Sequence, residues 1–223
     1  MTLQELIRRF RVRAHDNVEP YLWYNQDVTD WLNEAEQQAC LRGRLLREAA
    51  RQDVCRMVLD PAQSTYVLHP AVTEITHMRV IPGDGGRSRV VLLKSPDWLD
   101  AYVPDWRDED QPVRMAIQDD CSISLVGTIA AGDVLMLECY RLPMVSMADM
   151  ADVPEIHQAH HEHLIDWALY RAFSVPDADA FDPKRSEQAR QDFTAYFGEP
   201  PDKDMLRSTR HDVIHHTSPL RFP

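Results

Sequence analysis

The sequence predicts an α+β protein: a helical bundle built from both ends of the chain, an antiparallel β insertion and an extended C-terminal tail. Apolar residues recur at helical spacing before about residue 52, at alternate positions in the middle, and at helical spacing again after Pro143. This segregation of helices and strands differs from the alternating βαβ order of nucleotide-binding sheets. We expect a helical domain from residues 1–52 and 143–198, a β insertion over 53–142 and a tail over 199–223.

Two helices are predicted near the N-terminus. Thr2 and Glu5 have the spacing of a capping box, which predicts a helix from there to about Ala14. A second helix is predicted over 26–51, because apolar residues keep helical spacing along it. They are Val28, Trp31, Leu32, Ala35, Ala39, Leu45, Leu46 and Ala49. The aromatic residues Tyr21, Trp23 and Tyr24 precede it and form either a contact surface or a staple between the two helices.

The middle of the chain is predicted to form short antiparallel strands. Runs rich in Val, Ile and Leu are separated there by Gly, Pro and Asp. The runs cover 54–59, 66–68, 72–81, 87–93, 113–118, 122–126 and 134–140. Gly83-Asp84-Gly85-Gly86 predicts a hairpin turn. It lacks the Lys-Ser/Thr pair of a phosphate-binding loop, and no helix follows it.

Helical periodicity returns in the last third of the chain. Asp152-Val153-Pro154-Glu155 predicts the start of a helix that runs to about Ser174. Asp182-Pro183 predicts the start of another helix, and Gly198 its end. The remaining 25 residues have no sustained period and contain four prolines. Fully extended, such a tail could reach roughly 80 Å, and it would order most readily on another chain.

Composition narrows the function classes. The 24 Lys and Arg residues against 36 Asp and Glu give a net charge of −12, which disfavours a protein that grips DNA phosphates. The apolar runs are too short to span a bilayer, and the arginines among the first 13 residues leave no secretion signal. Four widely spaced cysteines fit reduced thiols in a cytoplasmic setting.

A histidine cluster is the strongest candidate for chemistry. His157, His160, His161 and His163 lie close together, and His157 and His161 have the i, i+4 spacing that can hold a metal on a helix. The two zinc-protease motifs fail by one residue each, since Gln158 stands where Glu is needed and Ala159 where His is needed. The sequence therefore favours a polar helix face, with His163 turned inward, and leaves a metal-dependent hydrolase as the weaker alternative.

No other motif predicts catalysis. The sequence contains no G-x-S-x-G nucleophile motif. A group of loop acids predicts a solvated rim rather than an acid–base pair, and it consists of Asp105, Asp108, Glu109, Asp110, Asp119 and Asp120. We therefore expect no enzyme activity, no cofactor and no metal.

Several short motifs, taken in order, resemble phage head-to-tail adaptor (connector) proteins, above all those of short-tailed phages with elongated heads. In the first third they are residues 2–7, Tyr21, Leu22, Trp23, Asp27, residues 31–36, Ala39 and Arg42. Around the strands they are residues 66–70, Ile75 and residues 140–143. In the last third they are residues 154–157, His161, Leu164, Trp167, Ala168, Phe193 and residues 196–198. The resemblance covers about residues 1–198.

The resemblance implies a non-enzymatic structural protein of the virion neck, assembled in the bacterial host cytoplasm. It implies a ring of twelve copies under the portal protein that continues the DNA channel and offers a docking surface to tail or nozzle proteins. DNA would pass without specific binding, because an acidic channel wall repels phosphates. A different virion part, such as a tail-completion protein, is the alternative.

Two sets of residues are predicted to make the contacts of this ring, in which each copy needs two unlike faces. Basic residues placed on the second helix are expected to face acids of a neighbouring copy: Arg42, Arg44, Arg47 and Arg51. Tail residues are expected to contact the portal or a neighbour: Arg210, Val213, Ile214, Leu220, Arg221 and Phe222.

Overall fold

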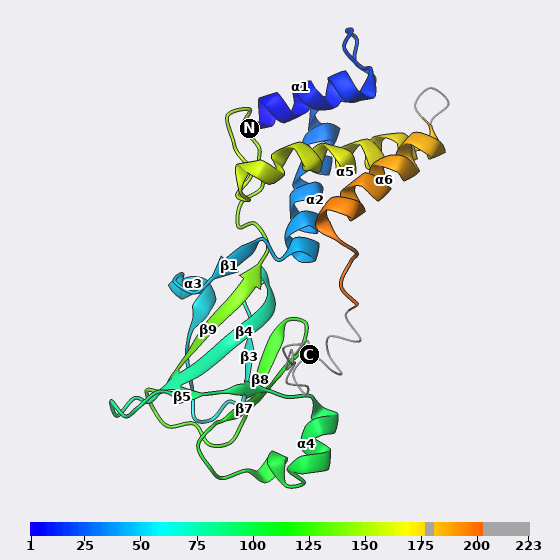
Figure 1. The fold of residues 1–223 in the computed structure, drawn as a ribbon. Coiled ribbons are helices and arrows are strands. Elements are labelled where there is room, and N and C mark those ends of the chain that lie inside the picture. The colour runs from blue at the N-terminus through cyan, green and yellow to red at the C-terminus, as the bar shows by residue number, and fades with distance from the viewer. Residues whose placement is uncertain (177–180, 203–223) are drawn as a thin grey trace, which may run out of the picture. The chain divides into compact units, whose positions relative to one another are not determined.

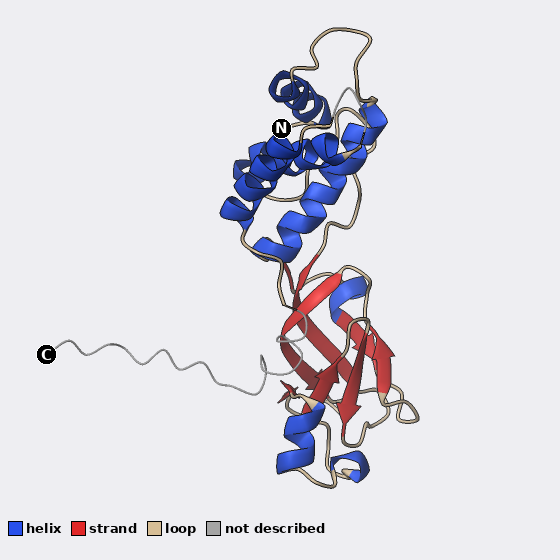
Figure 2. Cartoon of the chain, turned by 90° about the vertical axis from the view of Figure 1, so that its right-hand side faces the viewer, coloured by secondary structure: helices blue, strands red, loops and turns tan. Residues whose placement is uncertain are grey.

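The computed structural model describes residues 1–176 and 181–202, and in these the chain is an α+β protein, as the sequence predicts (Figures 1 and 2). It divides into a helical unit, Met1–Arg47 with Tyr140–Pro201, and a β unit that contains Glu48–Cys139. Most of the predicted tail, including the contact residues from Arg210 to Phe222, lies outside the described residues.

Four helices build the helical unit: α1 (Leu3–Ala14), α2 (Asn25–Gly43), α5 (His161–Ser174) and α6 (Pro183–Phe197) (Figure 1). The predicted capping box is confirmed, since the Thr2 hydroxyl accepts from the Glu5 N–H at 3.3 Å and the Glu5 carboxylate accepts from the Thr2 N–H at 3.0 Å. The Asp182 carboxylate caps α6, and Gly198, with φ 91°, ends it.

The core of this unit is one apolar cluster to which all four helices contribute. Small residues on α2 and α5 let the two backbones approach, and Ala35, Ala39, Ala168 and Ala172 are completely buried. Larger side chains fill the remaining space: Leu3, Leu6, Phe10, Leu32, Leu164 and Phe193. Each buried side chain of this size contributes about 1.5–3 kcal/mol to the free energy of folding.

The second helix is shorter than its apolar spacing predicts, and the prediction of a helix to residue 51 is wrong. It ends at Gly43, and Arg44 adopts the left-handed conformation (φ 51°) with its N–H on the Cys40 carbonyl at 3.0 Å. Leu45 and Leu46 still pack against the helical core, but from the chain that enters strand β1 (Leu46–Glu48). An apolar stripe therefore continued beyond the helix because the following segment covers the same core.

The start of α5 also differs from the prediction, because the segment from residue 142 to 156 is irregular. The Asp152 carboxylate accepts from the N–H groups of Ala148 and Asp149, which lie upstream of it. The Glu155 carboxylate likewise accepts from the upstream Met144 N–H at 3.0 Å. Neither side chain caps a helix that follows it, and α5 begins only at His161 after the 3-10 turn η2 (Gln158–His160).

The β unit contains two sheets. One has the order β1-β9-β4-β5, with β2 also paired to β9, and the other the order β3-β8-β7-β6. The strands are β2 (Arg56–Val58), β3 (Thr65–Val67), β4 (Val72–Ile81), β5 (Arg89–Val90), β6 (Leu92–Leu93), β7 (Met115–Gln118), β8 (Ser122–Val126) and β9 (Val134–Arg141). The short helices α3 (Gln52–Cys55) and α4 (Pro96–Tyr102) and the 3-10 turn η1 (Trp106–Asp108) lie in the connections.

One strand pair corrects the all-antiparallel prediction. Strands β6 and β7 are parallel, with Leu92 opposite Met115, because the connection between them contains α4 and returns the chain to the same edge. The predicted hairpin is confirmed, since β4 and β5 pair antiparallel with Val80 opposite Arg89. A Cβ on Gly83 would lie 2.6 Å from the Ala131 carbonyl oxygen, so this turn packs against the chain's own backbone.

Candidate interaction surfaces

The loop between α1 and α2, residues 15–24, is held by a buried arginine. Arg11 donates to Asp16 Oδ2 at 2.5 Å and, from its other amino group, to Asn25 Oδ1 at 2.5 Å and the Trp23 carbonyl at 3.2 Å. The Tyr21 ring covers the guanidinium, 3.6 Å from ring centre to Cζ. We call this segment the aromatic loop. One side chain of α1 thus bonds to a carboxylate and a backbone carbonyl of this loop and to Asn25, the first residue of α2.

The two roles that the sequence left open for the aromatic residues are divided among them. Trp23 is a core residue, edge-to-face with Phe10 at 5.6 Å and with Phe173 at 5.5 Å. Tyr24 is 79% exposed, and Val18 is exposed to the same extent. Trp23 therefore anchors the aromatic loop in the core, whereas Val18 and Tyr24 present apolar surface to solvent.

The irregular segment of residues 142–156, which we call the strap, is fastened to α1 and α2. The Asn33 amide makes two hydrogen bonds with the Met147 backbone, at 2.8 and 2.9 Å. The carbonyls of Asp152 and Met150 accept the first free N–H groups of α1 at 2.7 and 3.1 Å. The strap thus satisfies donors that every helix leaves unpaired at its N-terminus.

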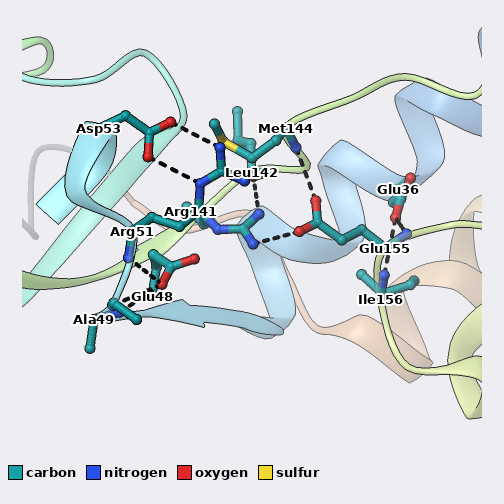
Figure 3. Close-up of polar contacts among 11 residues, drawn as sticks. Glu36, Glu48, Ala49, Arg51, Asp53, Arg141, Leu142, Met144, Glu155 and Ile156 are labelled. Carbon is teal, nitrogen blue, oxygen red and sulfur yellow. Dashed lines mark hydrogen bonds and ion pairs between the residues drawn. The ribbon is translucent and has the colours of Figure 1, made fainter.

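A buried carboxylate fixes the end of the strap (Figure 3). Glu36, on α2, accepts from the Glu155 N–H at 2.5 Å and the Ile156 N–H at 3.2 Å. Burial raises the pKa of Glu36, and the two backbone hydrogen bonds partly oppose this shift. Arg141 holds the Glu155 side chain at 2.5 Å, beside the bond from Met144 (Figure 3). Three apolar side chains of the strap face solvent: Val145, Met150 and Val153.

The histidines do not form the arrangement that the sequence suggested. His161 is the inward residue, with its ring between the Ile156 carbonyl and the Met1 amino group, each at 2.9 Å. His163, predicted to turn inward, instead stacks on Tyr196 of α6 with ring centres 3.5 Å apart. His157 precedes α5 and caps η2, so it shares no helix face with His161. The start of α5 decides this, because the helix begins at His161, nine residues after Asp152, where the sequence predicted its cap.

The described residues contain no group of three or more His, Cys, Asp or Glu side chains placed to hold a metal ion. Burial raises the pKa of the Cys40 thiol to about 12, which keeps it protonated at neutral pH. An open groove beside His163 is lined by acids that already have partners in the same chain. Arg9 pairs with Glu162, Arg13 with Asp166 at 2.5 Å, and Gln188 with Asp192 at 2.8 Å.

The four predicted contact arginines do not share a helix. Arg42 lies over the rings of Trp167 and Phe193 at 5.0 and 5.2 Å, and burial lowers its pKa. Arg44 caps α2 and Arg47 lies in β1, whereas Arg51 precedes α3 and pairs with Asp53 at 2.9 Å.

The loop acids agree with the predicted solvated rim. Five of the six are exposed, namely Asp105, Asp108, Asp110, Asp119 and Asp120. Nearby, Asp100 accepts from Arg107 at 2.7 Å and from the Trp106 indole at 2.8 Å, and these hydrogen bonds lower its pKa.

Sequence reasoning missed Arg11 and Glu36, the two charged residues that organise these surfaces. A signal was present, since Arg11 is four residues after Ile7 and Glu36 four after Leu32, so both fall on apolar stripes. A charged residue at such a position indicates a buried group with hydrogen-bond partners. The partners themselves could not be predicted, because they lie in segments without a periodic pattern.

Apolar segments fixed to the outside of a helical frame are typical of a subunit of a larger assembly. The comparison with protein families gives the class: the model of the SU10 adaptor protein family matches residues 1–220, and the chain belongs to this family. It is a phage head-to-tail adaptor family, so the chain is a structural protein of the virion neck that associates with portal and tail proteins in an oligomer. A search of curated proteins found no match. No helix in the described ranges has the length and apolar character needed to cross a membrane.

Proposed function

We propose that this adaptor forms a closed ring of twelve copies that docks under the portal, continues the DNA channel and provides the attachment surface for tail or nozzle proteins. The observation that carries the proposal is the family match over residues 1–220. The fold supports it, because a helical frame with exposed apolar segments presents several separate surfaces to partners. The ring acts by shape and charge, without a bond-making step.

The charge of the chain suits the wall of a DNA channel. Each copy has a net charge of −12, and a ring multiplies it. Phosphates are repelled over roughly 8–10 Å at physiological ionic strength, so DNA can slide without binding. Acidic side chains therefore dominate the surface that faces the channel in this proposal.

Two further contacts belong to the proposal. The tail, residues 199–223, binds the portal or a neighbouring copy through the residues from Arg210 to Phe222 named above. Arg42, Arg44, Arg47 and Arg51 face acids of a neighbour, but not from one helix face: Arg42 lies in α2, Arg44 follows it, Arg47 lies in β1 and Arg51 precedes α3.

The test is to mix the purified chain with portal rings and to image the mixture by electron microscopy. We expect an additional ring, coaxial with the portal, for the full chain. A chain that ends at residue 198 should keep the circular dichroism spectrum of the full chain but fail to join. A full chain that never joins the portal contradicts the proposed function, whereas joining by the truncated chain removes only the role of the tail.

A further inference from the structure

The exposed apolar side chains of the helical unit gather in two segments. Eleven large apolar residues are exposed in the described part of this unit, and seven of them lie in the aromatic loop or the strap. An eighth, Val12, lies in the last turn of α1, directly before the loop. The loop surface consists of Val12, Val18, Tyr21, Leu22 and Tyr24. The strap surface consists of Val145, Met150 and Val153. Single exposed apolar residues need no explanation, but grouped ones mark contact sites.

The backbones of the aromatic loop and of the part of the strap around residues 150–152 lie at opposite ends of α1 (Figure 1). The strap bonds to the N–H groups of Leu3 and Gln4, and the aromatic loop follows Ala14. At 1.5 Å per residue, the helix separates these ends by roughly 16 Å. Neither surface can therefore cover the other within one copy.

Both surfaces are ordered before any partner binds. The aromatic loop is fixed by Arg11 and by the Asp16 carboxylate, which accepts the Leu22 N–H at 2.9 Å. The strap is fixed by Asn33 and Glu36. Pre-ordered segments lose little conformational entropy on association, so their apolar area contributes more of its free energy to binding.

The two surfaces also complement each other chemically. Tyr24 combines a large apolar ring with a hydroxyl, and such residues dominate the energetics of protein interfaces. The strap has backbone N–H groups at Val145, Ser146 and Val153 that donate to no acceptor within residues 1–176 and 181–202. A tyrosine hydroxyl can accept from such donors while its ring lies on the neighbouring valines.

We propose that the loop surface of one copy packs on the strap surface of the next copy and so forms the repeating contact of the ring. The inference rests on the proposed ring, because a closed ring requires two unlike, complementary surfaces on every copy. The occupant of each surface is thus a second copy of this chain rather than the portal or a tail protein.

The test is crosslinking in assembled phage particles. Val18→Cys and Val145→Cys are mild changes, since both side chains are 79% exposed. Every variant also carries Cys121→Ser, because Cys121 is the exposed native thiol and the other three are buried. The particles are treated with a short bismaleimide, and the chain is then separated by size under denaturing conditions.

Particles assembled from a mixture of V18C chains and V145C chains should give a dimer band at least tenfold stronger than particles with either variant alone. Chains with both substitutions should give a ladder of higher multimers. Replacing V18C by Val67→Cys, another valine that is 79% exposed but lies in the β unit, should remove the band.

A dimer from V18C alone would show a two-fold contact and overturn the proposal, as would the absence of crosslinks in the mixture. The images of the portal complex separate this failure from that of the proposed function. A ring without crosslinks refutes only the loop–strap contact, whereas the absence of a ring refutes both.

Discussion

The aromatic loop and the strap are fixed to the helices by buried side chains of opposite charge. Each is an irregular segment that one buried charged side chain fixes to a helix. Arg11 binds the loop and has an ionised partner in Asp16, whereas Glu36 binds the strap through two neutral N–H groups. The charge of Glu155 has the same sign as that of Glu36 and raises the pKa of Glu36 further, in addition to burial.

An irregular segment can thus be fixed to a helix without an ion pair. Whether the buried charge has an ionised partner decides how the segment responds to substitution and to pH. When one member of a buried ion pair is removed, the other charge stays buried without a partner, and its desolvation destabilises the fold strongly. An unpaired carboxylate can be replaced by a neutral group that accepts the same hydrogen bonds. The loop is therefore expected to be sensitive to substitution, and the strap to pH.

The largest effect is expected for Arg11→Met. It leaves the Asp16 carboxylate buried without its cation, so the free energy of unfolding should fall by about 3–5 kcal/mol. Urea unfolding measures it, with Arg8→Met as the matched control on the exposed face of the same helix, expected within about 0.5 kcal/mol of wild type. A loss below about 1 kcal/mol for Arg11→Met would mean that Arg11 does not hold the loop.

The next largest effect is expected for Trp23, and its neighbour Tyr24 should contribute far less to the free energy of unfolding. Trp23→Ala removes a core ring between Phe10 and Phe173, and a loss of about 3–5 kcal/mol in unfolding free energy is expected. Tyr24→Ala should change stability by less than about 0.5 kcal/mol, because its side chain is exposed. Equal losses of unfolding free energy for Trp23→Ala and Tyr24→Ala would contradict the assignment of Trp23 to the core and of Tyr24 to the exposed surface.

A smaller effect is expected in the strap. Glu36→Ala leaves the N–H groups of Glu155 and Ile156 without their acceptor and should cost about 2–3 kcal/mol of unfolding free energy. Glu36→Gln keeps an oxygen in the same place without a buried charge and should remain within about 1 kcal/mol of wild type. If glutamine costs as much as alanine, the negative charge itself holds the strap.

The smallest effect is a pH dependence. The pKa of Glu36 is raised in the folded chain above its ordinary value of 4.5, so the folded state takes up the proton first. The resulting stability is complete below the unfolded pKa and is lost as pH rises through the folded pKa. Wild type should therefore gain stability relative to Glu36→Gln between about pH 7 and pH 4, by parallel urea titrations. If wild type instead loses stability relative to Glu36→Gln as the pH falls, the pKa of Glu36 is lowered in the folded chain rather than raised.

Elements with local signals were predictable from the sequence. The capping box at Thr2, the Asp182-Pro183 start and the Gly198 end of α6 depend on neighbouring residues alone. Strands β4 and β8 have the predicted bounds, because Pro82 and Gly127 directly follow them and mark where each strand ends.

Elements decided by distant contacts were not predictable. The end of α2 depends on a left-handed Arg44 that follows a glycine, although the apolar stripe continues through Leu46. The start of α5 depends on Asp152 and Glu155 bonding upstream instead of capping a helix. The inward position of His161 follows from that start, and the partners of Arg11 and Glu36 come from segments without a pattern.

The most direct test of the account is a cryo-EM reconstruction of the neck of the phage particle, at a resolution that shows side chains. We expect a ring of this chain against the portal, with Tyr24 of each copy on the strap of the next copy and acidic side chains towards the channel. A neck in which this chain forms no ring, or in which the loop and the strap of adjacent copies do not touch, would contradict the account.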